Sequence, residues 1–143
     1  MEKLSYKFHE FYMNIAIETA KLSYSQRSKV GCVVVKNKNI LSYGYNGTPV
    51  GFNNKCEDES GNTLPIVVHA ECNSLAKICS GTESSEGATM YCTLSPCFDC
   101  SKQIIQAKIK EVIYLEEYRI SESLNFLKQA SIKIIKFSDI QKF

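Results

Sequence analysis

The sequence predicts an α/β fold in which one sheet is covered by helices on both faces. After residue 69, helices and strands alternate, and before it an amphipathic helix is followed by two strands with hairpin character. The 143 residues suit one domain with its own core, and no repeat, linker or low-complexity tract interrupts them. We therefore expect a single domain over residues 1–143, with a mixed sheet of about five strands.

The first half of the chain predicts a helix, a hairpin and a long loop. Apolar residues at helical spacing indicate a first helix of about five turns, this stripe being Leu4, Phe8, Phe11, Tyr12, Ile15, Ala16 and Leu22. Val30–Val35 and Ile40–Tyr45 read as strands, and residues 36–39 between them suit a hairpin turn. Residues 46–65 hold most of the turn-forming residues and predict a surface loop, which at this length is usually functional.

The second half predicts alternating helices and strands. In chain order these are a helix from about His69 to Cys79, a strand at Ala88–Thr93, a helix from Ser95-Pro96 to about Lys108, a strand at Glu111–Leu115, a helix at Ser121–Ala130 and a strand at Ile132–Phe137. Because a helix connects the last two strands, we expect them to be parallel neighbours with a right-handed crossover.

Charge and cysteine content exclude several classes of protein. The net charge of +2 comes from 17 basic and 15 acidic residues that alternate in sign, which disfavours a nucleic-acid partner. Apolar runs are far shorter than the roughly 18 residues that span a bilayer, and we expect neither a membrane segment nor a secretory signal. We expect a cytoplasmic protein that keeps its seven cysteines reduced, so that clustered cysteines such as Cys97 and Cys100 serve metal binding or catalysis rather than disulfides.

Two segments combine metal-ligand residues with predicted helix starts. They are His69-Ala70-Glu71 and Ser95-Pro96-Cys97-Phe98-Asp99-Cys100. Cys97 and Cys100 lie one turn apart, so both thiolates can reach one ion, and a helix N-terminus favours the deprotonated form. His69 would supply a third ligand from the neighbouring helix. Three protein ligands leave one tetrahedral position open, which is the pattern of a catalytic zinc with bound water.

Glu71 has a separate role in this interpretation. Since the ion lies beyond the tip of the helix, His69 and Glu71 can both converge on it, and a carboxylate that does not bind the metal can move the proton of the water. Cys72 offers an alternative, because it could close a four-ligand site that is only structural. The combination of His-x-Glu with Pro-Cys-x-x-Cys favours the catalytic site, since it is the signature of zinc deaminases of cytosine and adenine.

These segments resemble the cytidine and deoxycytidylate deaminase superfamily, and most closely its compact phage-type deoxycytidylate (dCMP) deaminases. The matching pieces between about Ser23 and Phe137 are Arg27–Val35, Gly44–Pro49, His69–Asn73, Thr93–Cys100 and Glu117-Tyr118-Arg119. The resemblance implies a three-layer α-β-α deaminase fold, with zinc on His69, Cys97 and Cys100. It further implies that zinc-bound hydroxide attacks cytosine C4 with Glu71 as proton shuttle, giving ammonia and dUMP for thymidylate synthesis.

The resemblance also assigns contacts to the substrate. It directs the Ala70 N–H to cytosine O2 and the Ser95 carbonyl to the leaving amine. The remaining contacts are Ser23 and Arg27 for the phosphate, Asn46 for the sugar and Tyr118 as a cover over the phosphate. From the residues alone, Arg27 equally suits a solvated helix C-terminus, Asn46 a turn after a strand and Tyr118 a strand end.

Regulation is a further implication of the resemblance. Gly44, Tyr45, Asn46 and Gly47 correspond to a loop that often helps to form an effector site in homohexamers, where dCTP, with Mg²⁺, activates and dTTP inhibits. Two other functions stay open at this point: a nucleic-acid deaminase acting on tRNA adenosine or on cytidine, and a non-catalytic zinc module. The interspersed charges and the Gly-Tyr-Asn-Gly loop argue against the first, and a fully ligated zinc would indicate the second.

Overall fold

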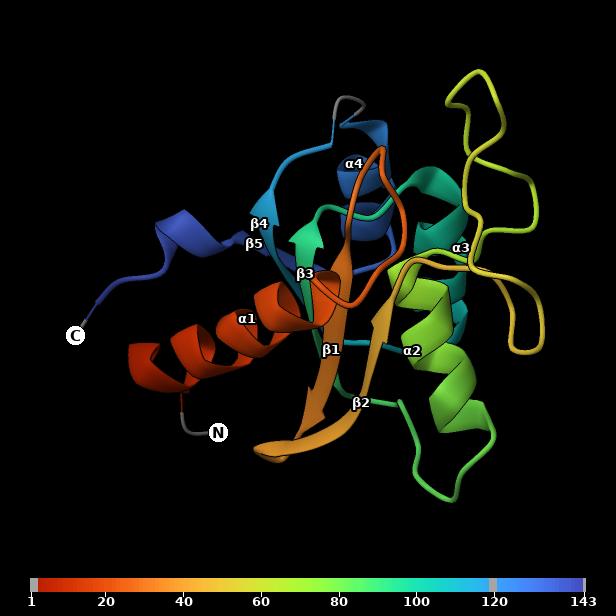
Figure 1. Cartoon of the computed structure of the whole chain (residues 1–143). Helices are drawn as coiled ribbons and strands as arrows, with labels where there is room; N and C mark the ends of the chain where they lie inside the picture. Colours follow the sequence, from red (N-terminus) through yellow and green to blue (C-terminus); the bar gives the residue numbers. More distant parts are fainter. Residues whose placement is uncertain (1–2, 119–120, 143) are drawn as a thin grey trace.

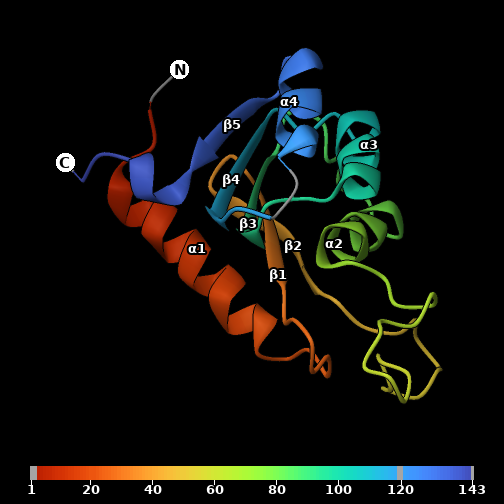
Figure 2. The same cartoon turned by 90° about the horizontal axis from the view of Figure 1, so that it is seen from above.

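One mixed sheet of five strands separates two layers of helices in the computed structural model, which describes residues 3–118 and 121–142. The elements are α1 (Tyr6–Ala20), β1 (Gly31–Lys36), β2 (Asn39–Tyr45), α2 (Ala70–Cys79), β3 (Thr89–Leu94), α3 (Phe98–Gln106), β4 (Glu111–Glu116), α4 (Glu122–Gln129), β5 (Lys133–Lys136) and a 3₁₀ helix (Phe137–Asp139). Figure 1 shows them along the chain, and in Figure 2 α1 covers one face of the sheet while α2, α3 and α4 cover the other. The expected three-layer α/β fold is confirmed.

The strand order is β2-β1-β3-β4-β5. β1 runs antiparallel to both β2 and β3, whereas β3, β4 and β5 are parallel, as expected for the last two strands from the helix that connects them. This arrangement brings the start of β1 and the ends of β2, β3 and β4 to one edge of the sheet. The segments that follow or precede those strand ends therefore meet there, and they include most of the residues predicted to act on a ligand.

The two faces of the sheet are covered by separate apolar clusters. Along β1, Val33 and Val35 face α1, while Cys32 and Val34 face the layer of α2, α3 and α4, which follows from the alternation of side chains along a strand. At Gly31 and Gly44 a helix backbone lies directly against the strand. A side chain at Gly31 would overlap the Ala16 carbonyl oxygen of α1, and a Cβ at Gly44 would lie 2.5 Å from the Ala70 carbonyl oxygen of α2.

The hairpin turn forms as expected, and the long loop contains β-bridges that the sequence did not indicate. The hairpin turn is confirmed, with Asn37 and Lys38 at positive φ values of 52° and 65°. Residues 46–65 form a loop as expected, but isolated β-bridges join Gly47 to Val68 and Glu57 to Thr63. Across residues 3–118 and 121–142, none of the helices has the length and apolar character that crossing a membrane requires.

Candidate active site

His69, Cys97 and Cys100 form a compact cluster of metal-ligand atoms at the edge of the sheet where the strand ends meet. The His69 Nδ1 and the two Sγ atoms all lie within 4.8 Å of one another. His69 Nδ1 is 3.3 Å from Cys100 Sγ and 3.4 Å from Cys97 Sγ. The two segments that the sequence singled out, 28 to 31 residues apart, are therefore brought together by the fold as predicted.

The local structure of both segments explains why these atoms converge. His69 is the N-cap of α2 and Cys97 is the N-cap of α3, each with extended backbone, so their side chains lie beyond the helix tips. The backbone N–H of Cys100 donates to Cys97 Sγ at 3.5 Å, which caps α3. Two helix N-termini thus point at one cluster, and their partial positive charge stabilises thiolates there.

The electrostatics of the cluster favour an ionised thiolate. Hydrogen bonding to the Cys100 side chain, together with that to His69, lowers the pKa of Cys97 to about 4. The hydrogen bond to Cys97 raises the pKa of His69 to about 9. The pKa of Cys100 is raised, first by its hydrogen bond to Cys72 and then by that to Cys97. A bound cation would displace the protons from such ligands, because a thiol must be deprotonated and an imidazole neutral to bind a metal ion.

The donor set and the separations fit zinc. Zinc bonds of about 2.3 Å to sulfur and about 2.0 Å to nitrogen at a tetrahedral angle place two ligand atoms about 3.5 Å apart. The observed separations of 3.3 and 3.4 Å from His69 Nδ1 to the two sulfur atoms are close to that value. Cys72 Sγ lies 3.7 Å from Cys100 Sγ but is not within 4.8 Å of all three ligand atoms, so the geometry does not favour the closed structural site.

Glu71 is a buried carboxylate beside this cluster. Its side chain is only 4% exposed, and burial raises the pKa of its carboxyl, although the hydrogen bond to Cys100 and the charge of His69 oppose the shift. As the second residue of α2, Glu71 lines the same cavity as His69 and Cys97. A carboxylate with a raised pKa, next to a metal site and open to a cavity, is suited to accept and return a proton.

The cavity at this site has a volume of about 360 Å³. It is lined by Ser25, Arg27, Ser28, Val30, Asn46, Thr63, Val67, His69, Ala70, Glu71, Leu94, Ser95, Cys97 and Tyr118. The predicted residues that line it are His69, Cys97, Glu71, Ala70, Ser95, Arg27, Asn46 and Tyr118. This size suits a small molecule, and its wall combines cationic, hydroxyl and apolar groups.

Ser23 is the predicted phosphate contact that the structure does not bring to the cavity. Its hydroxyl donates to the Asn46 carbonyl at 2.7 Å and accepts the Ser25 N–H at 3.1 Å, and the side chain is 2% exposed. Since a hydroxyl has one hydrogen to donate, Ser23 has none left for a phosphate oxygen. Ser23 thus ties the turn after α1 to the end of β2, and its expected phosphate contact, which would require the hydroxyl to release the Asn46 carbonyl, stays a prediction.

Asn46 and Tyr118 are held in place by backbone contacts. The Asn46 side chain accepts the Val30 N–H at 2.9 Å and donates to the Ser28 carbonyl at 2.7 Å, which leaves one amide hydrogen for a ligand. The Tyr118 N–H donates to Ser95 Oγ at 2.7 Å, which joins the segments that follow β3 and β4. Arg119, part of the segment cited with Tyr118, lies outside the described residues.

The segment predicted to bind effectors has a structural role in the described chain. Gly44 lies against the first turns of α2, and the Tyr45 carbonyl accepts the Asn73 side-chain amide at 2.8 Å. Gly47 pairs with Val68, the residue before His69. Of the four residues, only Asn46 lines the cavity, so effector binding at Gly44, Tyr45 and Gly47 stays a prediction.

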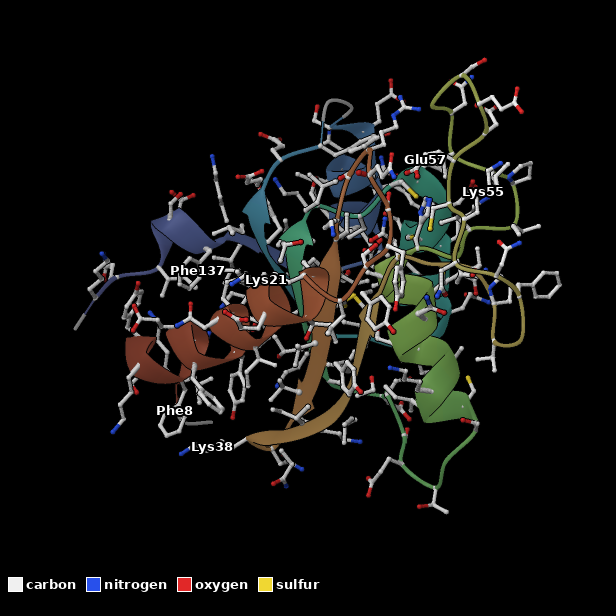
Figure 3. The ribbon with its side chains drawn as sticks, viewed as in Figure 1. Phe8, Lys21, Lys38, Lys55, Glu57 and Phe137 are labelled. Carbon is white, nitrogen blue, oxygen red and sulfur yellow. The ribbon has the colours of Figure 1, made fainter. Side chains whose placement is uncertain are left out.

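Sequence reasoning missed part of the cavity wall. Ser25, Ser28 and Thr63 line it, and Glu57 lies directly behind Ser25, with its carboxylate 2.8 Å from the Ser25 hydroxyl. Figure 3 shows Glu57 on the long loop beside the turn that follows α1. These residues carry no motif, and the contact joins segments about 30 residues apart, so no local pattern could have identified it.

Known proteins resemble the chain in both sequence and structure. Residues 6–116 match the family model described as the cytidine and deoxycytidylate deaminase zinc-binding region. A solved structure of dCMP deaminase from cyanophage S-TIM5, in complex with dCMP and dUMP, superimposes with a TM-score of 0.92 and is 45% identical, covering 94% of this chain and 99% of the other.

Two curated deoxycytidylate deaminases are similar in sequence to this chain, over different shares of their own length. The protein from Mycobacterium phage D29 is 37% identical over 122 residues, which is 76% of this chain and 94% of the relative. The protein from Saccharomyces cerevisiae is 35% identical over 139 residues, which is 90% of this chain but 44% of the relative. The chain therefore spans less than half of the yeast relative and nearly all of the phage relative.

Proposed function

Because the chain belongs to the family of cytidine and deoxycytidylate deaminases that share this zinc-binding region, we propose that it is a deoxycytidylate deaminase. The reaction is the hydrolysis of dCMP to dUMP and ammonia. The observation that carries the proposal is one cavity whose wall contains His69, Cys97 and the buried Glu71 together with the exposed cation Arg27. The similarity to the phage deoxycytidylate deaminases supports dCMP as the substrate.

His69, Cys97 and Cys100 would hold the zinc ion. Zinc bound there supplies a water molecule of lowered pKa and hence a nucleophile at neutral pH. Glu71 takes one proton of that water as the oxygen bonds to cytosine C4, and then gives the proton to N3. When the bond from C4 to the exocyclic nitrogen breaks, Glu71 carries the second proton of the water to the departing amine. The balance is dCMP and water to dUMP and ammonia.

Backbone groups at the two helix starts would orient the base. Ala70 is the first residue of α2, so its N–H has no acceptor within the helix and is available for cytosine O2. The Ser95 carbonyl, in the segment between β3 and α3, would accept a hydrogen bond from the amine. The Ala70 contact selects a base with a carbonyl at C2, and the Ser95 contact selects one with an exocyclic amine, because a buried donor or acceptor left unpaired is costly.

The phosphate would lie at the end of the cavity formed by the turn of residues 25–28. Arg27 and Ser28 both line the cavity and are exposed, and a guanidinium matches the geometry of phosphate oxygens. Ser28 takes the role first expected of Ser23, whose hydroxyl is engaged elsewhere. Tyr118 would cover the phosphate, and Asn46 would bind the sugar through its remaining amide hydrogen.

Regulation extends the proposal. We infer that the Gly44–Gly47 segment responds to dCTP with Mg²⁺ as activator and dTTP as inhibitor, in a homohexamer. Its contacts support this, since Gly44 touches α2 and Gly47 pairs with Val68, so movement of the segment would shift His69 and Glu71. Light scattering of the purified protein and the rate with and without each effector would test it. A monomer insensitive to both effectors would contradict it.

The deciding experiment is ammonia release by the zinc-loaded protein. dCMP, deoxycytidine and CMP are supplied in parallel, with and without dCTP and Mg²⁺. We expect turnover of dCMP at a far higher kcat/KM than of deoxycytidine, because dCMP has the phosphate that Arg27 would bind and deoxycytidine does not. A single-stranded DNA and a tRNA, tested alongside, cover the nucleic-acid alternative. Turnover of a nucleic acid and not of dCMP would contradict the proposal, and so would a protein that binds zinc and deaminates none of these substrates.

A further inference from the structure

One oxygen of the Glu57 carboxylate receives three hydrogen bonds from the turn that follows α1. The Ser25 hydroxyl donates to Glu57 Oε2 at 2.8 Å, and the backbone N–H groups of Gln26 and Arg27 donate to the same oxygen at 3.1 Å each. The Ser28 N–H in turn donates to Ser25 Oγ at 3.4 Å. The whole turn is therefore organised around a carboxylate that comes from a different segment.

From this geometry we propose that Glu57 is a positioning residue for substrate phosphate. It fixes the turn of residues 25–28 so that the Arg27 guanidinium and the Ser28 hydroxyl face the cavity. The inference rests on the proposed function, since it concerns the phosphate end of the same site. It adds a residue to which no motif assigns a role and which does not itself line the cavity.

The contact uses the backbone of Arg27 and leaves its side chain available. Within residues 3–118 and 121–142, no ion pair closer than 4.0 Å forms between Glu57 and the Arg27 guanidinium. A carboxylate that bound the guanidinium would compete with a phosphate for it, whereas one that binds the amide N–H groups orients the residue instead. The three donors also lower the pKa of Glu57, the Ser25 hydroxyl contributing most, so the carboxylate is ionised at neutral pH.

The loop that carries Glu57 is itself well defined. Glu57 pairs with Thr63 across an isolated β-bridge, and the Leu64 N–H donates to the Cys56 carbonyl at 2.8 Å. At the tip, Asp58 Oδ1 accepts the N–H groups of Ser60 and Asn62 at 2.9 Å each. Because Thr63 lines the cavity, this small closed loop connects the cavity wall to the turn of residues 25–28. A defined loop can hold its partner turn in one geometry.

The test compares Glu57→Ala and Glu57→Gln with Glu59→Ala, which removes an exposed carboxylate from the same loop and serves as the matched control. Zinc content and melting temperature are measured first, so that kinetics are compared among folded, metal-loaded proteins. We expect Glu57→Ala to raise the KM for dCMP about tenfold with kcat changed less than about threefold, since hydrogen bonds to a charged group are lost. Glu57→Gln, which keeps one acceptor, should show a smaller rise, and Glu59→Ala none.

A double-mutant cycle with Arg27→Ala separates positioning from a general structural role. If Glu57 acts through the 25–28 turn, Glu57→Ala should have little further effect on the KM for dCMP once Arg27 is removed. Turnover of deoxycytidine, which has no phosphate, should be the same in all these proteins. Fully additive effects, an unchanged KM for dCMP, or equal losses with dCMP and deoxycytidine would overturn the inference.

Calorimetric binding of dUMP and deoxyuridine gives a readout that does not need turnover. Glu57→Ala should weaken binding of dUMP about tenfold and leave that of deoxyuridine unchanged. Should the wild-type protein bind dUMP in this Glu57-dependent way without deaminating dCMP, the proposed function fails and the inference stands. Should the wild-type protein bind dUMP no more tightly than deoxyuridine, there is no phosphate site and the inference fails.

Discussion

At the scale of single residues, Glu71 is the group on which proton transfer depends. It is 4% exposed, and burial raises the pKa of its carboxyl. Replacing it by Gln keeps the shape of the side chain and removes the ability to hold a proton. We expect Glu71→Gln to retain its fold and one zinc ion per chain, while kcat for dCMP falls by about 10²–10⁴-fold.

Ammonia release and elemental zinc analysis on the same sample measure both parts of this prediction. A catalytic zinc site and a purely structural zinc site predict different results for Glu71→Gln. In the second case Glu71 would serve only packing, and Glu71→Gln would affect stability more than any activity. Near-full turnover of dCMP by a zinc-loaded Glu71→Gln protein would remove Glu71 from the mechanism.

Arg27 is the residue that would select a nucleotide over a nucleoside. Arg27→Ala should raise the KM for dCMP by about tenfold or more and leave deoxycytidine turnover unchanged, because only the phosphate contact is lost. Arg27→Lys should recover part of the effect, since it restores the charge without the planar fork. Lys55→Ala, which removes an exposed cation outside the cavity, is the control. Equal losses with both substrates would show that Arg27 does not bind the phosphate.

At the scale of elements, α1 packs directly against the backbone of β1 at Gly31. A Cβ at this position would overlap the Ala16 carbonyl oxygen and lie 2.6 Å from the Ala20 nitrogen. Both are backbone atoms of a helix, which cannot relieve the overlap by a change of rotamer. Gly31→Ala should therefore lower the free energy of unfolding by about 1–3 kcal/mol or more.

Urea denaturation at saturating zinc measures this effect. Gly81→Ala is the matched control, because a Cβ there would meet its nearest neighbour, the Ile78 carbonyl oxygen, at an ordinary 3.6 Å. Its free energy of unfolding should stay within about 0.5 kcal/mol of the wild-type value. If Gly31→Ala were equally harmless, α1 would not be held as close to the sheet as the structure has it.

Elements with strong local patterns could be predicted from the sequence, and contacts between distant segments could not. Strand composition and helix starts identified the helices and strands, and the helix between β4 and β5 implied their parallel pairing. The position of β1 between β2 and β3 had no such signal, because strand pairing depends on residues far apart in the chain.

The same division holds within the candidate site. Cys97 and Cys100 are separated by one helical turn and His69 begins a helix, so their convergence could be expected from spacing. The contact of Glu57 with the turn at Ser25 joins two irregular segments that have no periodicity. The contacts of Ser23 had no local signal for a related reason: its partners, the Asn46 carbonyl and the Ser25 N–H, are visible only in three dimensions.

At the scale of the whole molecule, the candidate metal site joins α2 and α3, two helices that cover the same face of the sheet (Figure 2). His69 is the N-cap of α2 and Cys97 is the N-cap of α3. In the sequence, β3 lies between these two helices. An ion bound to both would hold the helix starts together, and its binding energy would stabilise the folded state by mass action. Free zinc at 100–1,000 times its dissociation constant contributes about 2.7–4.1 kcal/mol.

We therefore expect a chelator to lower the melting temperature by roughly 5–15 °C, and added zinc to restore it. Differential scanning calorimetry at several free zinc concentrations measures this dependence. A His69→Ala variant, which lacks one ligand, should melt at a lower temperature that responds only weakly to zinc. An exposed-site variant such as Lys55→Ala should follow the wild-type curve. If the wild-type protein and His69→Ala responded to the chelator in the same way, the ion would not be bound between α2 and α3.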